Sequence, residues 1–374
     1  MADETQSTVS GILELESKGY GFLRPLTTAL SRQNGDVYVG AELINQYSLQ
    51  TGNLVEGVSE EDSGHSSPKL QTVTQINGLA PEAWVKCDQF ENLTPIAPEQ
   101  QLVLSKKSHD PSLRIIDLIC PIGRGQRALV VSPPRSGKTM LIQKIAQAIS
   151  KNYPDVSVNL LLLDERPEEV TDMRRTIDGE VFASSNDENI ETHLRLAQLV
   201  LEYAKRKVEA GEDVVILLDS LTRTGRAFNL GQRGSGRTMS GGIDASALQI
   251  PRKIFGAARK IEDGGSLTII ATVLVGTGSR MDEFIFQEFK GTGNMELVLD
   301  RDLANERIFP AINIAESGTR HEELLFGDQT PQFQALRRGL SKKQNKEAMS
   351  MLLGLVNKTK NNADLLKQIA RGGF

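Results

Sequence analysis

Short stretches in which hydrophobic and polar residues alternate fill the first part of the chain. Five of them, "SGILEL", "YGFLR", "DVYVGAEL", "NLVEGV" and "KLQTVTQI", lie between residues 9 and 78, and turn-forming segments such as "QNGD" and "QTGN" separate them. Alternation with a period of two is typical of half-buried β-strands, and the turn formers mark the strand ends. After a tail at residues 1–8, residues 9–78 are therefore predicted to form a small all-β barrel of the OB or cold-shock type.

The pattern changes after residue 111. The runs "RALVVS", "VNLLLLDE", "DVVILLDS" and "GSLTIIATVLV" are almost wholly apolar, whereas "GKTMLIQKIAQAIS" and "NIETHLRLAQLVLEYAKRKVEAG" place apolar residues at helical spacing. Continuous apolar strands that alternate with helices are typical of a mostly parallel sheet with helices on both faces. We predict an α/β domain over residues 111–374 that ends in helices, joined to the barrel by an irregular, proline-bearing linker at 79–110.

Composition narrows the class of protein. The chain has 374 residues, 39% hydrophobic and 24% charged, which suits two or three soluble domains. No apolar run is long enough to cross a bilayer and the start "MADETQSTVS" is unlike a signal peptide, so we expect a cytoplasmic protein without a membrane partner. Its two cysteines and four histidines have no metal-ligand spacing. The net charge of −5 argues mildly against bulk attraction to nucleic acid, but it leaves binding by ring stacking open.

The segment "VVSPPRSGKTML", residues 130–141, follows a predicted strand and opens a predicted helix. This context is typical of a phosphate-binding loop, in which Gly137 lets the backbone approach, Lys138 reaches the terminal phosphates and the Thr139 hydroxyl can hold Mg²⁺. The usual first glycine is replaced by Ser132, and two prolines remove N–H donors. Because serine is small and Arg135 adds positive charge, we expect the loop to bind a nucleotide still.

Two other predicted strands end on carboxylates. "VVILLDS" ends on Asp219, the expected position of an aspartate that holds the cation of the nucleotide, and "NLLLLDER" ends on Asp164 and Glu165. Residues at the carboxyl ends of parallel strands face the ligand crevice. Glu165 is therefore the candidate general base for ATP hydrolysis, and Arg166 is a candidate to contact phosphate or to orient that base.

The segment "KGYGFLRP", followed by "GDVYVG", has the aromatic pattern of cold-shock barrels. Tyr20 and Phe22 share one strand face, and Tyr38 lies on the next strand. Exposed rings on a barrel face serve as stacking platforms for the bases of single-stranded RNA, and Arg24 has the parity to reach a base edge or a phosphate.

Several longer segments together resemble the Rho family of bacterial transcription termination factors. They include "PIGRGQRALVVSPPRSGKTML", "LLDERPEEVTDMRR", "GGSLTIIATVLVGTGSRMDE", "EFKGTGNMEL" and "ERIFPAINIAESGTRHEELL". The family's own loop carries prolines and a small residue in place of the first glycine. The resemblance implies a homohexameric ring with a RecA-like core that binds ATP and Mg²⁺, hydrolyses ATP in response to RNA, and translocates on nascent RNA. It also implies the RNA polymerase elongation complex and Nus-type elongation factors as partners.

The resemblance also implies roles for particular residues. Glu165 is implied as the catalytic base, Asp219 and Thr139 as residues linked to the cation, Lys138 as a catalytic lysine and Arg320 as an arginine finger. The implied nucleotide contacts are Gly123, Arg124, Gly125, Gln126, Arg127, Ala128, Arg135, Ser136, Gly137, Lys138, Thr139, Met140, Arg166 and Phe309, the last stacking on adenine. The implied primary RNA site is Gly19, Tyr20, Gly21, Phe22, Leu23, Arg24, Asp36, Val37 and Tyr38, and the secondary site is Arg237, Thr238, Met239, Ser240, Gly241, Gly242, Arg280 and Lys290.

Two departures and two alternatives stay open at this point. The family tends to place a ring on the last barrel strand, where this chain reads "GHSSPKLQTV", and it often has a helical subdomain before the barrel, so the RNA preference is open. A rotary ATP synthase catalytic subunit has a similar core, but its loop would carry the first glycine and its barrel would lack the aromatic pattern. A non-catalytic RNA-binding protein would not need the residues Lys138, Glu165, Asp219 and Arg320.

Overall fold

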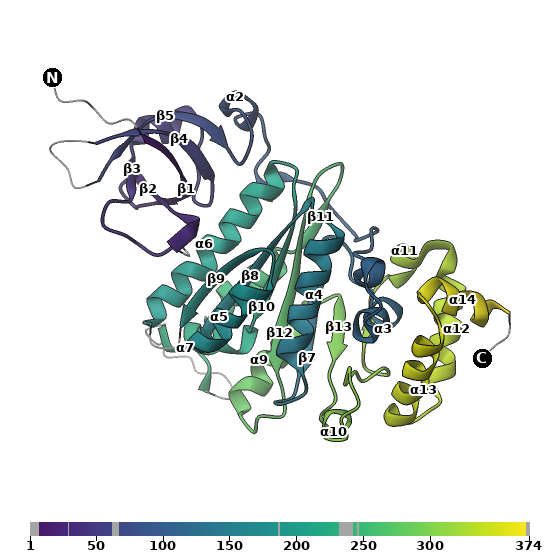
Figure 1. Cartoon of the computed structure of the whole chain (residues 1–374). Helices are drawn as coiled ribbons and strands as arrows, with labels where there is room; N and C mark the ends of the chain where they lie inside the picture. Colours follow the sequence, from purple (N-terminus) through teal and green to yellow (C-terminus); the bar gives the residue numbers. More distant parts are fainter. Residues whose placement is uncertain are drawn as a thin grey trace.

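The computed structural model describes residues 7–28, 30–61, 67–185, 188–231, 242–244 and 247–371. A small barrel lies at one end, a large sheet with helices on both faces forms the middle, and helices near the C-terminus form the other end (Figure 1). The predicted combination of an all-β barrel with an α/β core is thus confirmed.

The barrel closes in the strand order β1-β2-β3-β5-β4. Its strands are β1 (Ser7–Leu15), β2 (Gly21–Arg24), β3 (Val37–Val39), β4 (Leu54–Glu60) and β5 (Lys69–Ile76). The predicted strand "DVYVGAEL" is half wrong, because β3 ends at Val39 and helix α1 (Ala41–Gln46) follows. The physical reason is packing: as a short helix, this segment lays Leu43 and Ile44 against the end of the barrel core.

The segment 79–110 is structured along much of its length. Its elements are α2 (Pro81–Trp84), the 3₁₀ turns η2 (Phe90–Asn92) and η3 (Leu104–Lys107), and β6 (Pro95–Ile96). Trp84 is buried in the barrel core, Phe90 is buried in the core of the large domain, and β6 pairs with β11 (Arg259–Ile261). The expectation of an irregular linker therefore missed these anchoring contacts on both sides.

The large sheet has the strand order β14-β13-β7-β12-β10-β8-β9, in which all neighbours except β14 and β13 are parallel. The strands are β7 (Arg127–Ser132), β8 (Val156–Glu165), β9 (Glu180–Ser185), β10 (Asp213–Asp219), β12 (Ser266–Leu274), β13 (Met295–Val298) and β14 (Gly318–Thr319). The four central strands are the four apolar runs of the sequence, and they are buried on both faces.

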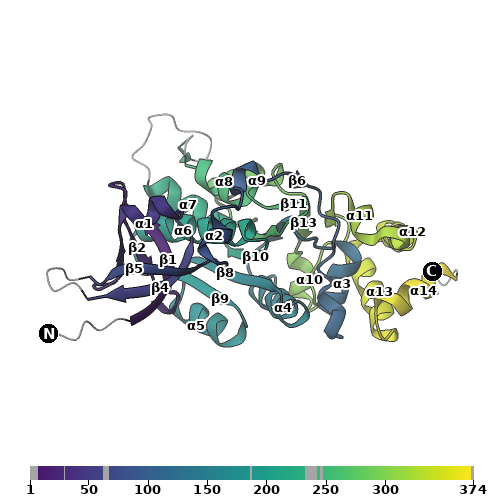
Figure 2. The same ribbon diagram turned by 90° about the horizontal axis from the view of Figure 1, so that it is seen from above.

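Helices cover the two faces of this sheet (Figures 1 and 2). They are α3 (Pro111–Ile119), α4 (Lys138–Asn152), α5 (Pro167–Thr176), α6 (Ile190–Glu209), α7 (Leu221–Gly231), α8 (Gln249–Gly256), α9 (Arg280–Lys290), α10 (Arg301–Asn305), α11 (Glu322–Phe326), α12 (Thr330–Ser341), α13 (Asn345–Lys358) and α14 (Asn362–Ala370). One apolar core joins the sheet to α3, α4, α5 and the last helices, and the other joins it to α6, α7, α8 and α9.

Parallel pairing brings the carboxyl ends of β7, β8, β10 and β12 to one edge of the sheet, which we call the carboxyl edge. The starts of the same strands form the opposite, amino edge. The loops that leave the carboxyl edge are those that the sequence singled out for nucleotide chemistry. In the described part of the chain, no helix combines the length and the apolar character that a membrane crossing requires.

Candidate nucleotide site and RNA-binding face

The phosphate-binding loop joins β7 to α4 at the carboxyl edge. Gly137 has φ +91°, a conformation that glycine adopts without strain, and it immediately precedes the first residue of α4. Ser132 is buried, and its hydroxyl lies 2.8 Å from the Ser136 hydroxyl, which in turn donates a hydrogen bond to the Pro133 carbonyl at 2.8 Å. A serine therefore fits the position of the missing glycine because its side chain points into the loop and ties it together.

Lysine and carboxylate meet directly behind this loop. The Lys138 ammonium forms an ion pair with Asp219 at the end of β10, and the Thr272 hydroxyl donates a hydrogen bond to the same carboxylate at 2.7 Å. Thr139, half-buried in the first turn of α4, lies next to the lysine in the chain. Among the described residues no cluster of His, Cys, Asp and Glu could hold a metal by itself. A hydroxyl and a carboxylate that share their cation with a nucleotide are the oxygen ligands that suit Mg²⁺.

Glu165 ends β8 and is only 3% exposed. The Arg223 guanidinium contacts its carboxylate at 3.1 Å and donates a 2.6 Å hydrogen bond to the Asp164 carbonyl. Burial and the negative charge of Asp219 raise the pKa of Glu165 to about 7, against the opposite effect of Arg223 and Lys138. A carboxyl group with this pKa can accept a proton near neutral pH, which is the property required of a general base.

Sequence reasoning missed Arg223, which lies near the start of α7 and holds the candidate base in place. The only signal was its position four residues after Asp219, at the start of the helix that follows β10. Arg166, predicted to contact phosphate or to orient the base, is exposed at the start of α5. Arg166 lies at the carboxyl edge, where a phosphate would bind, whereas it is Arg223 that contacts the Glu165 carboxylate.

An apolar cavity of about 480 Å³ lies beside the phosphate-binding loop. Two large side chains flank it with unusual exposure, Phe309 at 46% and Met140 at 65%, and Arg135 also lines it. The Phe309 ring lies against Gly137, where an added Cβ would stand 3.4 Å from it. Exposed apolar groups around a cavity of this kind fit a planar, weakly polar ring such as adenine. The predicted residues Arg135, Ser136, Gly137, Met140 and Phe309 are thus brought together, along with the unpredicted Leu141, Leu299 and Ala311.

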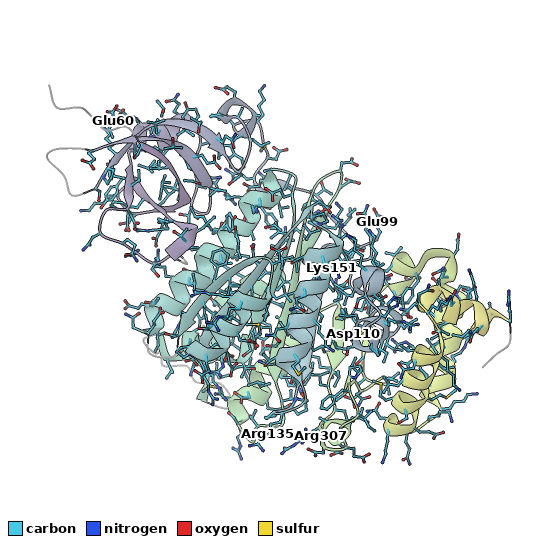
Figure 3. All side chains as sticks on the ribbon, viewed as in Figure 1. Glu60, Glu99, Asp110, Arg135, Lys151 and Arg307 are labelled. Atoms are coloured by element: carbon cyan, nitrogen blue, oxygen red, sulfur yellow. The ribbon has the colours of Figure 1, made fainter. Side chains whose placement is uncertain are left out.

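The segment Gly123–Ala128 is not part of this group. It leads into β7 at the amino edge, so it lies a strand's length, roughly 15–20 Å, from the loop at the other end. Arg124 forms ion pairs with Asp155 and Asp213 there, and its N–H donates to the Gln100 carbonyl. In Figure 3, the labels Glu99 and Arg135 mark these two separate regions. The implied contact of these six residues with a nucleotide on the same chain is therefore not supported by the geometry.

Arg320 also lies at the amino edge. It follows β14, its N–H donates to the Asn294 carbonyl at 2.8 Å, and its side chain is exposed beside a cavity of about 420 Å³. Since β14 pairs with the start of β13, Arg320 is separated from the phosphate-binding loop of its own chain by the length of the sheet. The loop and the predicted finger thus occupy opposite edges of one sheet.

Three aromatic rings form one cluster on the outside of the barrel. The ring centres of Tyr20, Phe22 and Tyr38 lie 5.5–5.9 Å apart, and all three side chains are half-exposed. Phe22 stands directly opposite Tyr38 in the pairing of β2 with β3. The rings do not form the barrel core, which is made by Leu13, Leu23, Val39 and other mainly aliphatic side chains.

The side chains of Arg24 and Leu23, which flank the rings on β2, are buried, although the alternation along the strand predicts that Arg24 is exposed. Arg24 is 4% exposed, and its guanidinium contacts Glu14 at 2.6 Å and Asp36 at 2.5 Å beside the Phe22 ring. A phosphate contact by Arg24 is therefore disfavoured, because two carboxylates already surround its charge. Leu23 points into the barrel core, so only its backbone is available to a ligand. The remaining members of the predicted primary site, Gly19, Gly21, Asp36 and Val37, lie on or between the same strands.

The predicted secondary RNA site is described only in part. Arg237, Thr238, Met239, Ser240 and Gly241 lie outside the described residues, and Gly242 is exposed with φ +79°. Arg280 and Lys290 are exposed at the two ends of α9, so about 15 Å of helix separates them. Arg280 follows the carboxyl end of β12, whereas Lys290 lies toward the amino edge, and the two side chains do not form one cluster.

Comparison with known proteins assigns both halves of the chain. Residues 9–82 match the RNA-binding domain of the Rho termination factor, and residues 112–319 match the nucleotide-binding domain of the ATP synthase alpha/beta family. Relatives named transcription termination factor Rho include those of Borreliella burgdorferi (48% identical over 97% of this chain and 71% of the relative), Cereibacter sphaeroides (50%, 95% and 85%) and Neisseria gonorrhoeae (49%, 98% and 88%).

Solved structures share the fold at low sequence identity. A type III secretion system ATPase of pathogenic bacteria aligns with a TM-score of 0.63 and 18% identity, over 83% of this chain and 93% of that structure. The ATP synthase subunit NeqB of Nanoarcheaum equitans aligns with a TM-score of 0.60 and 16% identity, over 74% and 77%. These likenesses concern the fold alone. The match to the Rho RNA-binding domain, together with 48–50% identity over nearly the whole chain, favours the Rho family over a rotary ATP synthase subunit. The chain belongs to the Rho family of transcription termination factors.

Proposed function

We propose that this protein is an RNA-dependent ATPase that moves along nascent RNA as a homohexameric ring and releases transcripts from the RNA polymerase elongation complex. The observation that supports it best is the presence, in one chain, of an exposed cluster of aromatic rings and a complete set of groups for ATP hydrolysis. The proposal includes action in the cytoplasm and contact with Nus-type elongation factors, as the family resemblance implies.

The nucleotide site assigns a task to each residue. The backbone N–H groups of the loop and the Lys138 ammonium bind the phosphates, and Phe309 and Met140 enclose the adenine. Lys138 would exchange its contact with Asp219 for the terminal phosphates when ATP binds, and Asp219 and Thr139 would then be free to hold Mg²⁺. Bound Mg²⁺ would neutralise the charge that develops on the phosphates. Glu165, oriented by Arg223, accepts the proton of the attacking water.

The arginine finger is proposed to act between subunits. Arg320 and the phosphate-binding loop lie at opposite edges of the sheet, so Arg320 reaches a terminal phosphate only if that phosphate is bound by a neighbouring chain. The segment Gly123–Ala128 shares the amino edge with Arg320 and would meet a nucleotide only in the same way. This arrangement supports an assembly in which each subunit completes the site of the next.

RNA is proposed to bind first on the barrel, with bases stacked on Tyr20, Phe22 and Tyr38. Acidic residues outnumber basic ones in residues 1–70, which makes stacking and base-edge contacts more important than attraction of phosphates. Arg24 and Asp36, which are 4% and 5% exposed, form an ion pair beside the rings that is proposed to support the strands that carry them. The segment 237–242, with Arg280 and Lys290, is proposed as the second RNA site.

The test is ATP hydrolysis by the assembled protein, titrated with polycytidine, polyuridine and polyadenine RNA. We expect at least one of these polymers to stimulate hydrolysis strongly, and the order of the three defines the base preference. A rotary-type ATPase would hydrolyse ATP at the same rate with and without RNA, and a non-catalytic RNA-binding protein would bind RNA without hydrolysis. Either result would refute the proposal.

A further inference from the structure

The carboxylate of Glu14, on the barrel, forms ion pairs with three arginines. Glu14 lies on β1 directly opposite Phe22 of the aromatic cluster, and it contacts Arg24 at 2.6 Å, Arg32 at 3.0 Å and Arg195 at 2.5 Å. We call these four residues the Glu14 cluster. Although burial alone raises it, the hydrogen bonds from the arginines lower the pKa of Glu14 to about 2. The carboxylate is therefore charged, ordered and adjacent to the proposed RNA-binding rings.

Arg195 is the member of the Glu14 cluster that comes from the other domain. It lies in the second turn of α6, and its guanidinium grips both Glu14 oxygens, with Nε to Oε1 at 2.5 Å and Nη2 to Oε2 at 2.6 Å. It also donates a 2.9 Å hydrogen bond to the Leu30 carbonyl of the barrel. Arg24 and Arg32 belong to the barrel itself. Within the described residues, Arg195–Glu14 is the one ion pair that joins the barrel to the large domain.

Apolar packing also joins the two domains, because Ile12 and Leu30 of the barrel are buried in the core that contains α6. Further close and polar contacts are made with α6 itself. The barrel loop at Gly52 packs on the backbone of Glu202, and Gln50 accepts a hydrogen bond from Arg206. Asn77 donates a hydrogen bond to the Arg206 carbonyl at 3.2 Å. These contacts lie near the end of α6, three turns from Arg195. Polar contacts thus attach the barrel to this helix at two separate places, in addition to the apolar packing.

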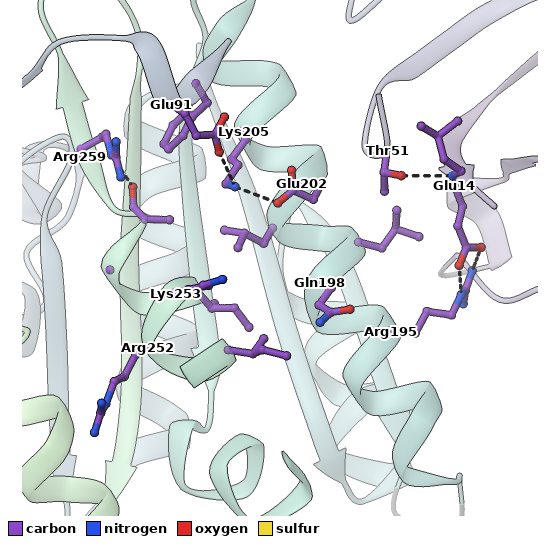
Figure 4. A pocket seen from close by; sticks show the side chains of 18 residues that line it. Glu14, Thr51, Glu91, Arg195, Gln198, Glu202, Lys205, Arg252, Lys253 and Arg259 are labelled. Atoms are coloured by element: carbon purple, nitrogen blue, oxygen red, sulfur yellow. Dashed lines mark hydrogen bonds and ion pairs between the residues drawn. The ribbon is translucent and has the colours of Figure 1, made fainter. Parts of the chain in front are cut away.

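A wide cleft lies beside this line of contact (Figure 4). Its volume is about 1020 Å³, and it separates Leu15 and Thr51 of the barrel from Arg252 and Lys253 on α8. The cleft leaves the barrel without support on this side, so its orientation depends on its contacts with α6 and the adjoining core. Loss of the Arg195 attachment would remove the ion pair that fixes the barrel near the start of the helix.

We propose that the Glu14–Arg195 pair is the contact through which RNA captured on the barrel stimulates ATP hydrolysis in the core, an inference that rests on the RNA-dependent ATPase proposed above. Glu14 and Arg195 are positioning residues in this scheme and contact neither ATP nor its cation. RNA bound to the rings orients the barrel, and the pair passes that orientation to α6. An ion pair with two parallel hydrogen bonds suits this role because it fixes direction as well as distance.

A continuous series of packed elements leads from this pair to the candidate base. Helix α6 packs against α7, and α7 carries Arg223, which holds Glu165. A small rotation of α6 would therefore displace Arg223, the residue that contacts the candidate base Glu165. The proposal is therefore tested by a direct measurement of coupling between RNA binding and ATP hydrolysis.

The experiment compares Arg195→Met with wild type in the full chain, using whichever of the three RNA polymers stimulates wild type most. Methionine keeps the length of the side chain but removes every donor, and Glu14 keeps Arg24 and Arg32 as partners, so the barrel still folds. We expect affinity for a labelled oligomer of the same base to stay unchanged, while RNA-stimulated turnover falls about fivefold or more, the range of typical coupling between sites. Arg195→Lys, which keeps the charge but loses the two parallel bonds, should give an intermediate loss.

Arg32→Gln is the matched control. It removes the same charge from the same carboxylate, but Arg32 belongs to the barrel and 58% of its side chain is exposed, against 19% for Arg195. We expect wild-type stimulation by RNA. ATP affinity and thermal stability, measured on all variants, show whether a loss reflects damage to the core.

The outcomes separate this inference from the proposed function. If wild type ignores RNA, the proposed function itself fails. If wild type is stimulated and Arg195→Met is stimulated equally, only the coupling role is refuted. If Arg195→Met loses affinity for the oligomer to the same degree as turnover, the Glu14 cluster belongs to the RNA site. If Arg32→Gln loses as much RNA-stimulated turnover as Arg195→Met, the stimulation depends on the charge around Glu14 and not on the contact between the domains. Both results would overturn the inference.

Discussion

Glu165 can accept a proton only when it is ionised, and its surroundings set the pH at which this happens. Because burial and Asp219 raise its pKa to about 7, the carboxyl is protonated below that pH and available as a base above it. We expect the turnover number for ATP at saturating RNA to rise through neutral pH and level off, as measured from about pH 5.5 to 9.

Arg223 supplies the control for this pH profile. Its positive charge lowers the pKa of Glu165, so Arg223→Gln should move the midpoint of the profile to higher pH, whereas Glu165→Gln should remove most of the activity at every pH. A wild-type profile that stays flat over this range, or an Arg223→Gln midpoint at lower pH, would contradict the assignment of the base.

Phe22 is a half-exposed ring of the aromatic cluster and contacts both Tyr20 and Tyr38. Phe22→Ala should weaken binding of single-stranded RNA by ~1–3 kcal/mol, the usual contribution of one stacked base. Fluorescence titration with a labelled oligonucleotide measures it. The control is Tyr47→Ala, which removes a ring that packs on the barrel core at the end of α1. A control that loses as much RNA affinity as Phe22→Ala would show that the rings act through barrel stability.

The sequence was sufficient to predict those site residues that are recognised by the residues next to them in the chain. Lys138 begins the helix that follows β7, and Glu165 and Asp219 are the last residues of β8 and β10, so motif and strand end together predicted them. The burial of Arg24 could not be predicted, because its partners Glu14 and Asp36 come from other strands. Arg223 and Arg195 were missed for the same reason, since each acts on a carboxylate from a distant element.

Among the helices, α6 is the one on which the barrel rests, and Gly52 marks the closest approach. Gly52 has φ +96°, and an added Cβ would lie 2.3 Å from the carbonyl carbon of Glu202. Gly52→Ala is expected to reduce stability by roughly 1–3 kcal/mol through overpacking, in addition to backbone strain. Thermal unfolding and limited proteolysis of the segment between the domains would measure the loss of docking.

Gly35 offers a matched control for the backbone strain alone. It has φ +98°, but an added Cβ would meet no atom within 4 Å. Gly35→Ala should therefore cost only about 1 kcal/mol and leave the docking of the barrel intact. If the two substitutions have equal effects, the close contact between the loop and α6 does not contribute to stability.

Elements with strong periodicity were predicted correctly, and those that depend on distant packing were not. The four apolar strands, α4 and α6 follow from the sequence pattern. Helix α1 did not, because "AEL" continues an alternating stretch and only the barrel core favours a helix there. A family motif does not state at which edge of the sheet its residues lie, so the position of the segment Gly123–Ala128 at the amino edge did not follow from the sequence, and its nucleotide contact stays a prediction.

For the whole molecule, the separation of Arg320 from its own loop predicts complementation between subunits. Arg320→Ala and Lys138→Ala should each abolish hydrolysis, and mixed assemblies of the two should regain some single-site turnover. A wild-type loop from the first variant then meets a wild-type finger from the second, and such fingers contribute roughly 10³–10⁵ in rate. Arg320→Ala alone should retain ATP binding, because the finger acts on charge that develops during the reaction.

Subunit exchange must be verified before the result is interpreted. Mass spectrometry of the mixture can show assemblies that contain both variants, and mixtures of each variant with itself provide the baseline. Verified mixed assemblies without any recovery would mean that Arg320 works within its own chain or outside the active site.

The placement of loop and finger at opposite edges of one sheet also constrains symmetry. In a two-fold contact, one surface patch of each subunit would have to hold both its loop and its finger, although the sheet separates them. A head-to-tail contact needs only one edge of each subunit. If Arg320 acts between subunits as proposed, an open chain of such contacts leaves an unmatched loop at one end and an unmatched finger at the other, and closure by rotation gives every loop a finger.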